Sequence, residues 1–435
     1  MATPVMPIMI HRKINNGQLR MAILSVQIFL FNLGVIPITH SAETGDESKA
    51  HYTKSTLGLY DVSTFDIYKD GQNIHIIAGG RLSPDDTSLT IRHKQSKNGG
   101  YSWTDPVTVK AEGQLPAINA KRGNDIQLAA KGNQLVALMQ KKNELPGMGS
   151  IICLYSTNNG ETWQSGSNPA KDDAGSQAHI EIVADNKGFF HAVWLEDPEE
   201  NGYQSLRYAR SEDGGRSWSQ LKTIEGSTCS CCWNTLLNSP LNHLKVLYRD
   251  MAPRDMALVQ STDAGITWQQ LGTVGHFGWQ LKGCPQVGGN ADYVINGDAQ
   301  WLHSLVWTGM PEKAGLYHLF SSDHGFTWSM PARLSKTGMN GDIAHHGGHI
   351  VAVWNELEAA GMSVVYARTT DNGATWSKPA QLAQAENATT QPRLISTQNG
   401  VLAIWTEKPA RQAGYLAWKM IEITTAHHTK REAPM

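Results

Sequence analysis

Short apolar runs separated by polar turns cover most of the chain. Seven of these runs share one form, an apolar stretch that ends in a polar or charged residue. They are residues 74–81 (IHIIAGGR), 134–142 (QLVALMQKK), 191–197 (HAVWLED), 243–250 (HLKVLYRD), 303–309 (HSLVWTG), 349–356 (HIVAVWNE) and 401–408 (VLAIWTEK). Runs of this length, rich in β-branched and aromatic residues, predict strands. No long 3.6-residue apolar period occurs, so we expect almost no helix.

A second pattern, which we call the box, occurs six times and reads Ser/Thr-x-Asp/Asn-x-Gly-x-Ser/Thr-Trp. The six boxes are Ser96–Trp103, Ser156–Trp163, Ser211–Trp218, Ser261–Trp268, Ser321–Trp328 and Thr369–Trp376. An Asp or Asn side chain accepts hydrogen bonds from nearby backbone amides, and Gly permits a positive φ. The Trp ring supplies apolar surface to pack beneath the turn. Each box therefore predicts a tight hairpin turn.

The spacing of the boxes predicts the fold. Successive box tryptophans lie about 55 residues apart, and the chain after its N-terminal segment holds about seven such units. We therefore predict an all-β fold, a seven-bladed β-propeller of four-stranded antiparallel sheets, with six blades as the alternative. The seventh unit lacks a box. We expect an N-terminal strand near Leu57–Val62 to complete its sheet and close the ring.

The composition supports a repeated unit and excludes one function class. The chain has 14 Trp but only 8 Phe, together with 41 Gly, as expected for repeated Trp-bearing turns. Its 37 basic and 39 acidic residues leave a net charge of −2. A nucleic-acid binder needs a concentrated basic surface, so we expect no nucleic-acid partner.

The N-terminus is typical of an export signal. Basic residues precede a mainly apolar run at 21–38, and the small residues Ser41 and Ala42 then offer a cleavage site. We predict a signal peptide (1–42), a polar linker (43–56), a propeller (57–424) and a disordered tail (425–435). An uncleaved membrane anchor is the alternative for the apolar run. After signal removal we expect no membrane span, a monomer, and a periplasmic or extracellular location.

The boxes resemble the Asp-box, or BNR, repeats of the sialidase (neuraminidase) superfamily. The resemblance extends over nearly all of the chain after residue 42 and is closest around residues 70–110. The cysteine-containing segment described below resembles a subgroup of bacterial sialidase-like proteins. The resemblance implies an exo-glycosidase that acts on sialic acid or related acidic glycans. The partner would then be a glycan or glycoconjugate.

The same resemblance implies a set of catalytic residues. Sialidases hold the sugar carboxylate with three arginines, which meet it in bidentate fashion, and use an Asp, a Tyr and a Glu for the chemistry. The first arginine is missing here, because Asp66 or its neighbours stand at that place on the first inner strand. The remaining candidates on strand ends are Arg81, Arg249, Arg254 and Arg393.

Carboxylates and a tyrosine complete the catalytic candidates. Glu181 lies on a predicted inner strand, and Tyr248 precedes Arg249 and Asp250 in the segment YRD. Other carboxylates end the repeated strands, namely Glu196, Glu356 and Glu407. Each is weighed against the alternative of a solvated residue at the rim. The candidate catalytic set is Arg81, Glu181, Tyr248, Arg249, Asp250 and Arg393.

Four cysteines form the feature that the sialidase pattern does not explain. Cys229, Cys231 and Cys232 precede or form the fourth inner strand and Cys284 opens the fifth, so adjacent blades can bring them together. Three interpretations remain open: a disulfide, a thiolate metal site, and a reactive thiol. Thiolates suit copper or zinc. Met251, Met256, His243 and His276 are candidate additional ligands, and Cys153 is expected to be a buried apolar residue.

Two functions therefore compete. The first is an exported sialidase-like glycosidase, which the arginine- and carboxylate-ended strands favour. The second is a non-catalytic propeller that binds copper, zinc or a partner at a cysteine-lined funnel. The segment AHHGGH, with His345, His346 and His349, is interpreted as a turn between two strands.

Overall fold

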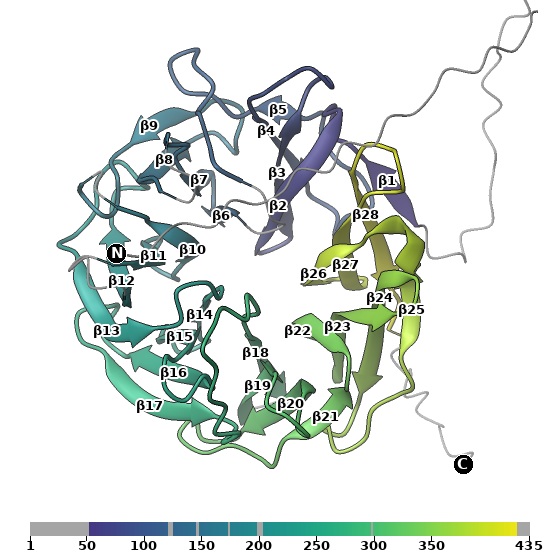
Figure 1. Ribbon diagram of the computed structural model, residues 1–435. Helices are drawn as coiled ribbons and strands as arrows, with labels where there is room; N and C mark the ends of the chain where they lie inside the picture. The colour runs from purple at the N-terminus through teal and green to yellow at the C-terminus, as the bar shows by residue number, and fades with distance from the viewer. Residues whose placement is uncertain are drawn as a thin grey trace, which may run out of the picture. The chain divides into compact units, whose positions relative to one another are not determined.

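The computed structural model describes residues 52–120, 125–144, 148–172, 175–197, 203–296 and 299–423. Their strands form seven four-stranded antiparallel sheets around a common axis, which confirms the predicted seven-bladed propeller over the six-bladed alternative (Figure 1). The predicted signal peptide (1–42) and tail (425–435) lie outside the described residues. Among the described residues, no helix is long and apolar enough to cross a membrane.

Each blade is a simple meander whose first strand lies nearest the axis. From the axis outward, blades 1 to 3 are β2 (Asp61–Asp70), β3 (Asn73–Arg81), β4 (Thr90–Ser96), β5 (Val107–Thr108); β6 (Ile126–Lys131), β7 (Gln134–Gln140), β8 (Ile151–Ser156), β9 (Gln164–Gly166); and β10 (Ala178–Ala184), β11 (Phe190–Glu196), β12 (Gln204–Ser211), β13 (Lys222–Thr228). Blades 4 and 5 are β14 (Thr235–Asn238), β15 (Leu244–Arg249), β16 (Met256–Ser261), β17 (Gln269–Val274); and β18 (Asn290–Asn296), β19 (Ala299–Thr308), β20 (Gly315–Ser321), β21 (Ala332–Ser335). Blades 6 and 7 are β22 (Gly338–His346), β23 (His349–Glu358), β24 (Gly361–Thr369), β25 (Ala380–Ala383); and β26 (Thr390–Thr397), β27 (Gly400–Glu407), β28 (Tyr415–Ile421), β1 (Thr53–Ser55). A short 3₁₀ helix, η1 (Ala385–Asn387), follows β25.

An N-terminal strand closes the ring, but it is not the segment that the sequence predicted. β1 pairs with β28 on the outer edge of blade 7, with Thr53 opposite Trp418 and Ser55 opposite Leu416. The predicted segment Leu57–Val62 instead begins as a turn, in which Leu57 and Gly58 have φ values of 52° and 76°. The Leu57 side chain is 2% exposed. Its apolar character therefore reflects burial in this turn and does not mark a strand. The closing strand falls within the segment expected to be a linker.

The box turns form the hairpins that the pattern predicted. In the box of blade 4, Asp263 accepts a hydrogen bond from the Thr267 backbone N–H at 2.8 Å and from its hydroxyl at 2.6 Å. Ser261 accepts the Gly265 N–H at 2.8 Å. The same contacts recur in the other boxes with Asp or Asn. Every box connects the third strand of its blade to the region of the fourth, on one face of the propeller that we call the lower face.

The boxes also pack each blade against the blade before it. Gly265 of blade 4 lies over Tyr208 of blade 3, so close that a Cβ at Gly265 would be 1.7 Å from the Tyr208 oxygen. Gly160 lies against His93 and Gly373 against His318 in the same relation. Tyr208 is 1% exposed and donates a hydrogen bond to the Ala264 carbonyl at 3.2 Å. Glycine is therefore required at this position by a close approach as well as by its backbone conformation.

We expect Gly265→Ala to destabilise the propeller through the contact with Tyr208. The matched control is Gly272→Ala, because Gly272 also has a positive φ, 94° against 84°, but a Cβ there would meet nothing within 4 Å. Gly272→Ala should lower the free energy of unfolding by the cost of its backbone conformation alone. Gly265→Ala should lower it by about 1–3 kcal/mol more, because the added Cβ overpacks a buried contact. Urea unfolding of both variants measures the difference. Equal free energies of unfolding would show that the blade contact is not tight.

Candidate functional site

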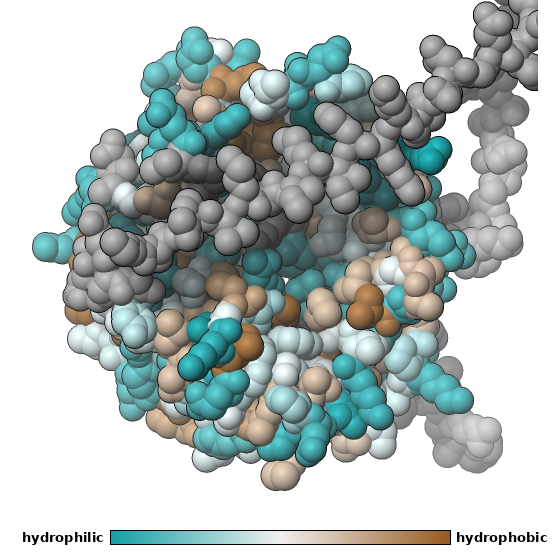
Figure 2. Space-filling view, in the orientation of Figure 1, coloured by the Kyte–Doolittle hydropathy of each residue, from teal (hydrophilic) through white to brown (hydrophobic). Residues whose placement is uncertain are grey.

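A cavity of about 440 Å³ lies on the propeller axis. The innermost strands β2, β10, β14, β18, β22 and β26 contribute to its lining, and in Figure 1 they surround the centre of the ring. In the space-filling view, hydrophilic residues cover much of the outer rim of the face shown (Figure 2). The volume lies in the range of small-ligand sites, so the cavity is the first candidate site.

One residue from each innermost strand lies at the same level along this axis. These residues correspond to one another because each pairs with the equivalent position on the second strand of its own blade. We call these residues the axial ring. They are Asp66, Gln127, Glu181, Thr235, Asn290, Asp342 and Arg393, opposite Ile77, Leu138, Val193, Leu247, Leu305, Val353 and Ile404. All seven are polar, and three of them are carboxylic acids. The charge at the axis is therefore set by three acids and one arginine.

Arg393 connects two of the axial acids. Its guanidinium lies 3.4 Å from an Asp342 oxygen and 3.7 Å from an Asp66 oxygen. Each Asp also accepts a backbone N–H from the inner strand of the following blade, Asp66 from Leu128 at 2.8 Å and Asp342 from Leu394 at 2.7 Å. These contacts hold both carboxylates in place and join blade 1 to blade 2 and blade 6 to blade 7.

Arg393 alone does not supply enough positive charge for the three buried acids to be ionised together at neutral pH. Burial, with the neighbouring Asp66 and Asp342, raises the pKa of Glu181 to about 8, although Arg393 opposes the shift. Burial also raises the pKa of Asp66 and that of Asp342, again against Arg393. Because like charges in one site cannot all ionise, the cluster of Glu181, Asp66 and Asp342 retains a proton at neutral pH.

The lower end of the cavity contains a second charged group. His345 of β22 lies 3.0 Å from the Asp292 carboxylate of β18, and the pKa of His345 is raised because this contact outweighs the effect of burial. The other two histidines of AHHGGH end the strands of one hairpin, with His346 opposite His349. This segment is thus the turn that the sequence indicated.

The arginines predicted to clamp a carboxylate have separate partners. Arg81 pairs with Asp61 at 2.8 Å and donates to the Pro84 carbonyl. Arg249 is buried and donates to three backbone carbonyls, those of Val287, Arg254 and Trp307, at 3.0, 2.6 and 2.9 Å. Arg393 is the member of the set that lines the axial cavity. The structure therefore does not bring the three guanidinium groups to one substrate carboxylate.

The predicted nucleophile and its neighbour also lie outside the axial cavity. Tyr248 is on the second strand of blade 4, and its hydroxyl contacts Gln270 at 3.1 Å and Glu225 at 3.5 Å. Burial, and then the carboxylates Glu225 and Asp250, raise the pKa of Tyr248, which disfavours a phenolate nucleophile. Asp250 follows β15 and accepts the Met251 N–H at 2.7 Å.

The three strand-ending glutamates have structural partners. Glu196, Glu356 and Glu407 each accept a hydrogen bond from the indole N–H of the tryptophan two residues earlier, at 3.2, 2.6 and 2.8 Å. These tryptophans, Trp194, Trp354 and Trp405, are fully buried. The repeated Trp-x-Glu segment is thus a way of satisfying a buried indole donor.

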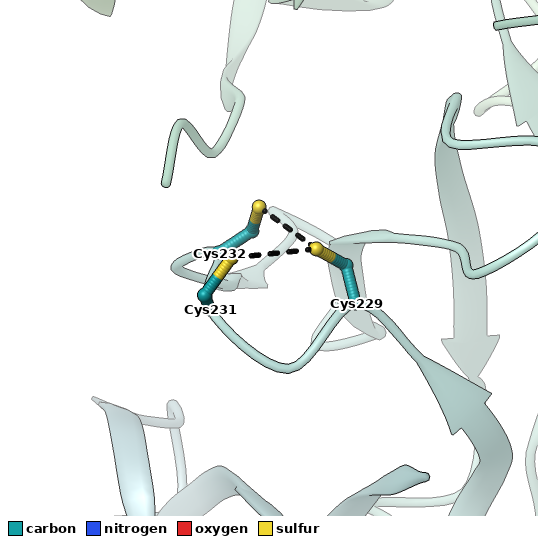
Figure 3. A group of neighbouring side chains, drawn as sticks. All are labelled: Cys229, Cys231 and Cys232. Carbon is teal, nitrogen blue, oxygen red and sulfur yellow. Dashed lines mark hydrogen bonds between the residues drawn. The ribbon is translucent and has the colours of Figure 1, made fainter. Parts of the chain in front are cut away.

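The cysteines form a second site on the face opposite the boxes, which we call the upper face. The Cys229 sulfur lies 3.7 Å from the Cys231 sulfur and 3.2 Å from that of Cys232 (Figure 3). All three side chains are buried, and the sulfurs lie within 4.8 Å of one another. We call these three residues the thiol cluster. Hydrogen bonds from Cys231 and Cys232 lower the pKa of Cys229, and the same bond to Cys229 raises that of Cys231.

Two arginines and a fourth cysteine border the thiol cluster. Arg254 donates to the Cys229 sulfur at 2.9 Å, and Arg249 lies against Cys232. Cys284, from the loop between β17 and β18, is exposed and lies 3.6 Å from the Ser230 hydroxyl and next to Cys231. Cys153 lies elsewhere, buried in the core of blade 2 beside the Gly215 carbonyl. The four clustered cysteines of the sequence are thus neighbours in the structure.

Three of the four proposed additional ligands have other surroundings. His243 precedes β15, at the end of β14 away from the cysteines, and His276 contacts the Thr273 hydroxyl at 2.7 Å. Met256 is buried in the core between blades 4 and 5.

Sequence reasoning missed Asp342 and the role of Arg254 beside sulfur. A signal for the axial acids was present, because an acid followed by Ile occurs in three inner strands at Asp66, Glu181 and Asp342. No such signal marks Arg254, whose contact with Cys229 depends on the loop conformation.

Comparison with known proteins agrees with the repeat pattern. Residues 78–287 match the family described as the BNR repeat-like domain. A search of curated proteins found no significant match.

Solved structures share the fold at low sequence identity. An ulvan lyase of a polysaccharide lyase family is 9% identical, with 85% of this chain and 96% of that chain covered and a TM-score of 0.55. The Trypanosoma rangeli sialidase in complex with the inhibitor DANA is 11% identical, with 86% and 60% covered and a TM-score of 0.49. A Dyadobacter fermentans protein of unknown function is 13% identical, with 69% and 94% covered and a TM-score of 0.49. The match thus spans only 60% of that sialidase. Together, the BNR match over residues 78–287 and the seven blades agree with the repeat that the boxes predicted: the chain is a β-propeller with BNR-like repeats.

Proposed function

We propose that this chain is an exported glycan-acting propeller, that its axial cavity binds an uncharged saccharide unit, and that Glu181 is its proton donor. The single observation that carries the proposal is the axial ring, which places Glu181, with its pKa raised to about 8, beside the carboxyl groups of Asp66 and Asp342 in a cavity of about 440 Å³. Glycans are the ligand class because the chain is a sialidase-like propeller and the ulvan lyase that shares its fold is bound to a saccharide.

The chemistry of the axial ring suits hydrolysis of a glycosidic bond. Such hydrolysis uses one carboxylic acid to protonate the leaving oxygen and one carboxylate to activate water or attack the sugar. Glu181 retains its proton at neutral pH, so it supplies the first group. Asp66 and Asp342, each held by a backbone N–H and by Arg393, supply the second. Water adds across the C–O bond, and Glu181 regains its proton from that water.

The charge of the cavity favours an uncharged saccharide over sialic acid. With Glu181 protonated, Asp66 and Asp342 together exceed the single charge of Arg393. At the level of the axial ring, an anionic sugar would therefore meet net negative charge, and Arg393 is already paired. The charged residues Lys69, Asp292 and His345 line the same cavity nearer its lower end. The described arginines Arg81, Arg249 and Arg393 do not assemble the three-arginine clamp that a sialoside needs, so we infer that the resemblance to sialidases extends to the fold and not to their substrate.

Replacement of Glu181 by Gln tests the proton donor. On a panel of neutral and acidic fluorogenic glycosides, we expect the wild-type chain to cleave a neutral member. Glu181→Gln should lower kcat by about 10²–10⁴-fold, because loss of a general acid costs this much. Glu161→Gln, the same change at an exposed box residue, should leave the rate unchanged. Cleavage of the sialoside alone, or an unchanged rate in Glu181→Gln, contradicts the proposal.

The pH dependence of stability tests the protonation of Glu181 independently of any substrate. The folded chain keeps this proton up to about pH 8, whereas the unfolded chain loses it near 4.5. The native state thus binds more protons in this window, and the free energy of unfolding falls as pH rises through it. Glu181→Gln removes this contribution. The free energy of unfolding of Glu181→Gln minus that of wild type should therefore increase by at least about 1 kcal/mol from about pH 5 to about pH 8.5. This corresponds to a relative gain of about 2 °C in Tm.

Urea unfolding at the two pH values provides this measurement, with Glu161→Gln as the control for a lost surface charge. Parallel curves for wild type and Glu181→Gln would show that Glu181 is ionised in the folded chain at neutral pH.

Export is tested with the full chain. Protein recovered from the exported fraction should begin near Ala42 by intact mass, because a signal peptidase cuts after small residues. Leu30→Arg should abolish export, since a charge within the apolar run prevents its insertion. Leu30→Ala, which keeps the run uncharged, is the control. Uncleaved protein held in the membrane would support the anchor in place of the signal.

A further inference from the structure

The thiol cluster has the composition and geometry of a metal site. We propose that Cys229, Cys231 and Cys232, with Cys284 as a fourth ligand, bind one thiophilic d¹⁰ cation, Cu(I) or Zn(II), on the upper face. This inference is independent of the proposed glycan site, since none of the four cysteines lines the axial cavity.

The distances between the sulfurs match those of a thiolate site. A metal–sulfur bond of about 2.3 Å in a tetrahedral or trigonal site places the ligand sulfurs about 3.8–4.0 Å apart. Cys229 lies 3.7 and 3.2 Å from its two neighbours, and the sulfurs lie within 4.8 Å of one another. A shift of a few tenths of an ångström therefore brings the three buried sulfurs to ligating positions. Thiolates without imidazole or carboxylate partners favour soft d¹⁰ ions.

The positive charges of two buried arginines beside the thiol cluster require anionic partners. Arg254 donates to the Cys229 sulfur and Arg249 lies against Cys232, and both guanidinium groups are buried. Backbone carbonyls satisfy the donors of Arg249 but do not neutralise its charge. Cu(I) with three thiolates and Zn(II) with four thiolates each carry a net charge of −2. Two buried arginines balance this charge.

The backbone around the cluster is fixed by contacts that do not involve the metal. The Cys229 N–H donates to the Arg249 carbonyl at 2.9 Å, and Thr228 pairs with Asp250 in an isolated bridge. The Arg254 N–H donates to the Trp279 carbonyl at 2.7 Å, which joins this site to the loop that carries Cys284. The ligands are therefore held in place by adjacent strands, as a site of fixed geometry needs.

An opening for the ion lies beside Cys231. A cavity of about 320 Å³ is lined by Ser230 and Cys231 together with Asn119, Gln140 and Ser176. Cys284, whose sulfur lies 3.6 Å from the Ser230 hydroxyl, is exposed. The ion thus reaches the buried sulfurs from solvent, and Cys284 is the ligand that moves to complete the site.

The role of Cys284 distinguishes the two ions. Zn(II) in thiolate sites is four-coordinate, so it needs Cys284. Three sulfurs suffice for Cu(I). Cys284→Ser should therefore weaken Zn(II) binding by at least about 100-fold, since loss of outer-shell partners alone costs about 10–100-fold. The same variant should leave Cu(I) affinity within about threefold if Cu(I) binds the three buried thiolates.

The experiment uses the full chain, purified, reduced and loaded under nitrogen with Zn(II) alone or Cu(I) alone. Metal analysis gives the stoichiometry, competition with a chromophoric chelator gives the affinity, and X-ray absorption gives the ligands. We expect one ion per chain with metal–sulfur distances of about 2.3 Å. Cys231→Ser and Cys232→Ser should lose the ion. Cys153→Ala, which changes a buried cysteine in blade 2, should retain it.

Several outcomes would overturn the proposal. One is an absence of stoichiometric metal in reduced wild-type protein, and another is metal that survives Cys231→Ser and Cys232→Ser. A third is a thiol count showing that the four cysteines form two disulfides, together with a failure of the protein to bind metal once these disulfides are reduced. X-ray absorption of the loaded wild type needs no variant, so the test holds even if a substitution prevents folding. Glycoside cleavage, assayed on the same samples with and without the ion, reports separately on the axial site.

Discussion

Pairing between β1 and β28 is the constraint on which the rest of the structure depends. It joins residues that are about 360 positions apart and converts an open row of sheets into a ring. Without this pairing, blade 7 would have three strands and an unpaired edge. The seven inner strands share one axis only in the closed ring. Both candidate sites are assembled by elements that this closure holds together.

The axial ring shows what ring closure makes possible and what it costs. Burial of three acids around one arginine disfavours the fully ionised state, which is the physical reason for the raised pKa of Glu181. Asp66 and Asp342 offset part of this cost by accepting backbone N–H groups from neighbouring blades. The same contacts fix the positions of the carboxylates. A protonated acid and two held carboxylates therefore arise from one balance of desolvation, hydrogen bonding and charge.

The thiol cluster uses a different part of the same architecture. The loops that lead from blade 3 to blade 4 and from blade 4 to blade 5 both reach the upper face, so cysteines about 50 residues apart meet beside each other there. Trp233 connects the two sites, because it follows Cys232 in the chain and lines the axial cavity. The arginines that the sialidase resemblance assigned to a sugar carboxylate are divided between the sites. Arg393 faces the acids, and Arg249 and Arg254 face sulfur.

The sequence by itself determined the propeller class and the structure of the turns, and it favoured seven blades over six. Boxes such as Ser261–Trp268 encode local contacts, between Asp263 and Thr267 for example, that do not depend on the rest of the chain. The sequence also placed Glu181 and Arg393 on inner strands and brought the four cysteines together. Only the tertiary structure decided which polar residues meet. In a strand, a shift of one residue reverses the side-chain direction, so the pattern of Tyr248, Arg249 and Asp250 did not show which side chain faces the axis. The contact of Arg393 with Asp66 spans more than 300 residues, and it exists only because the ring closes.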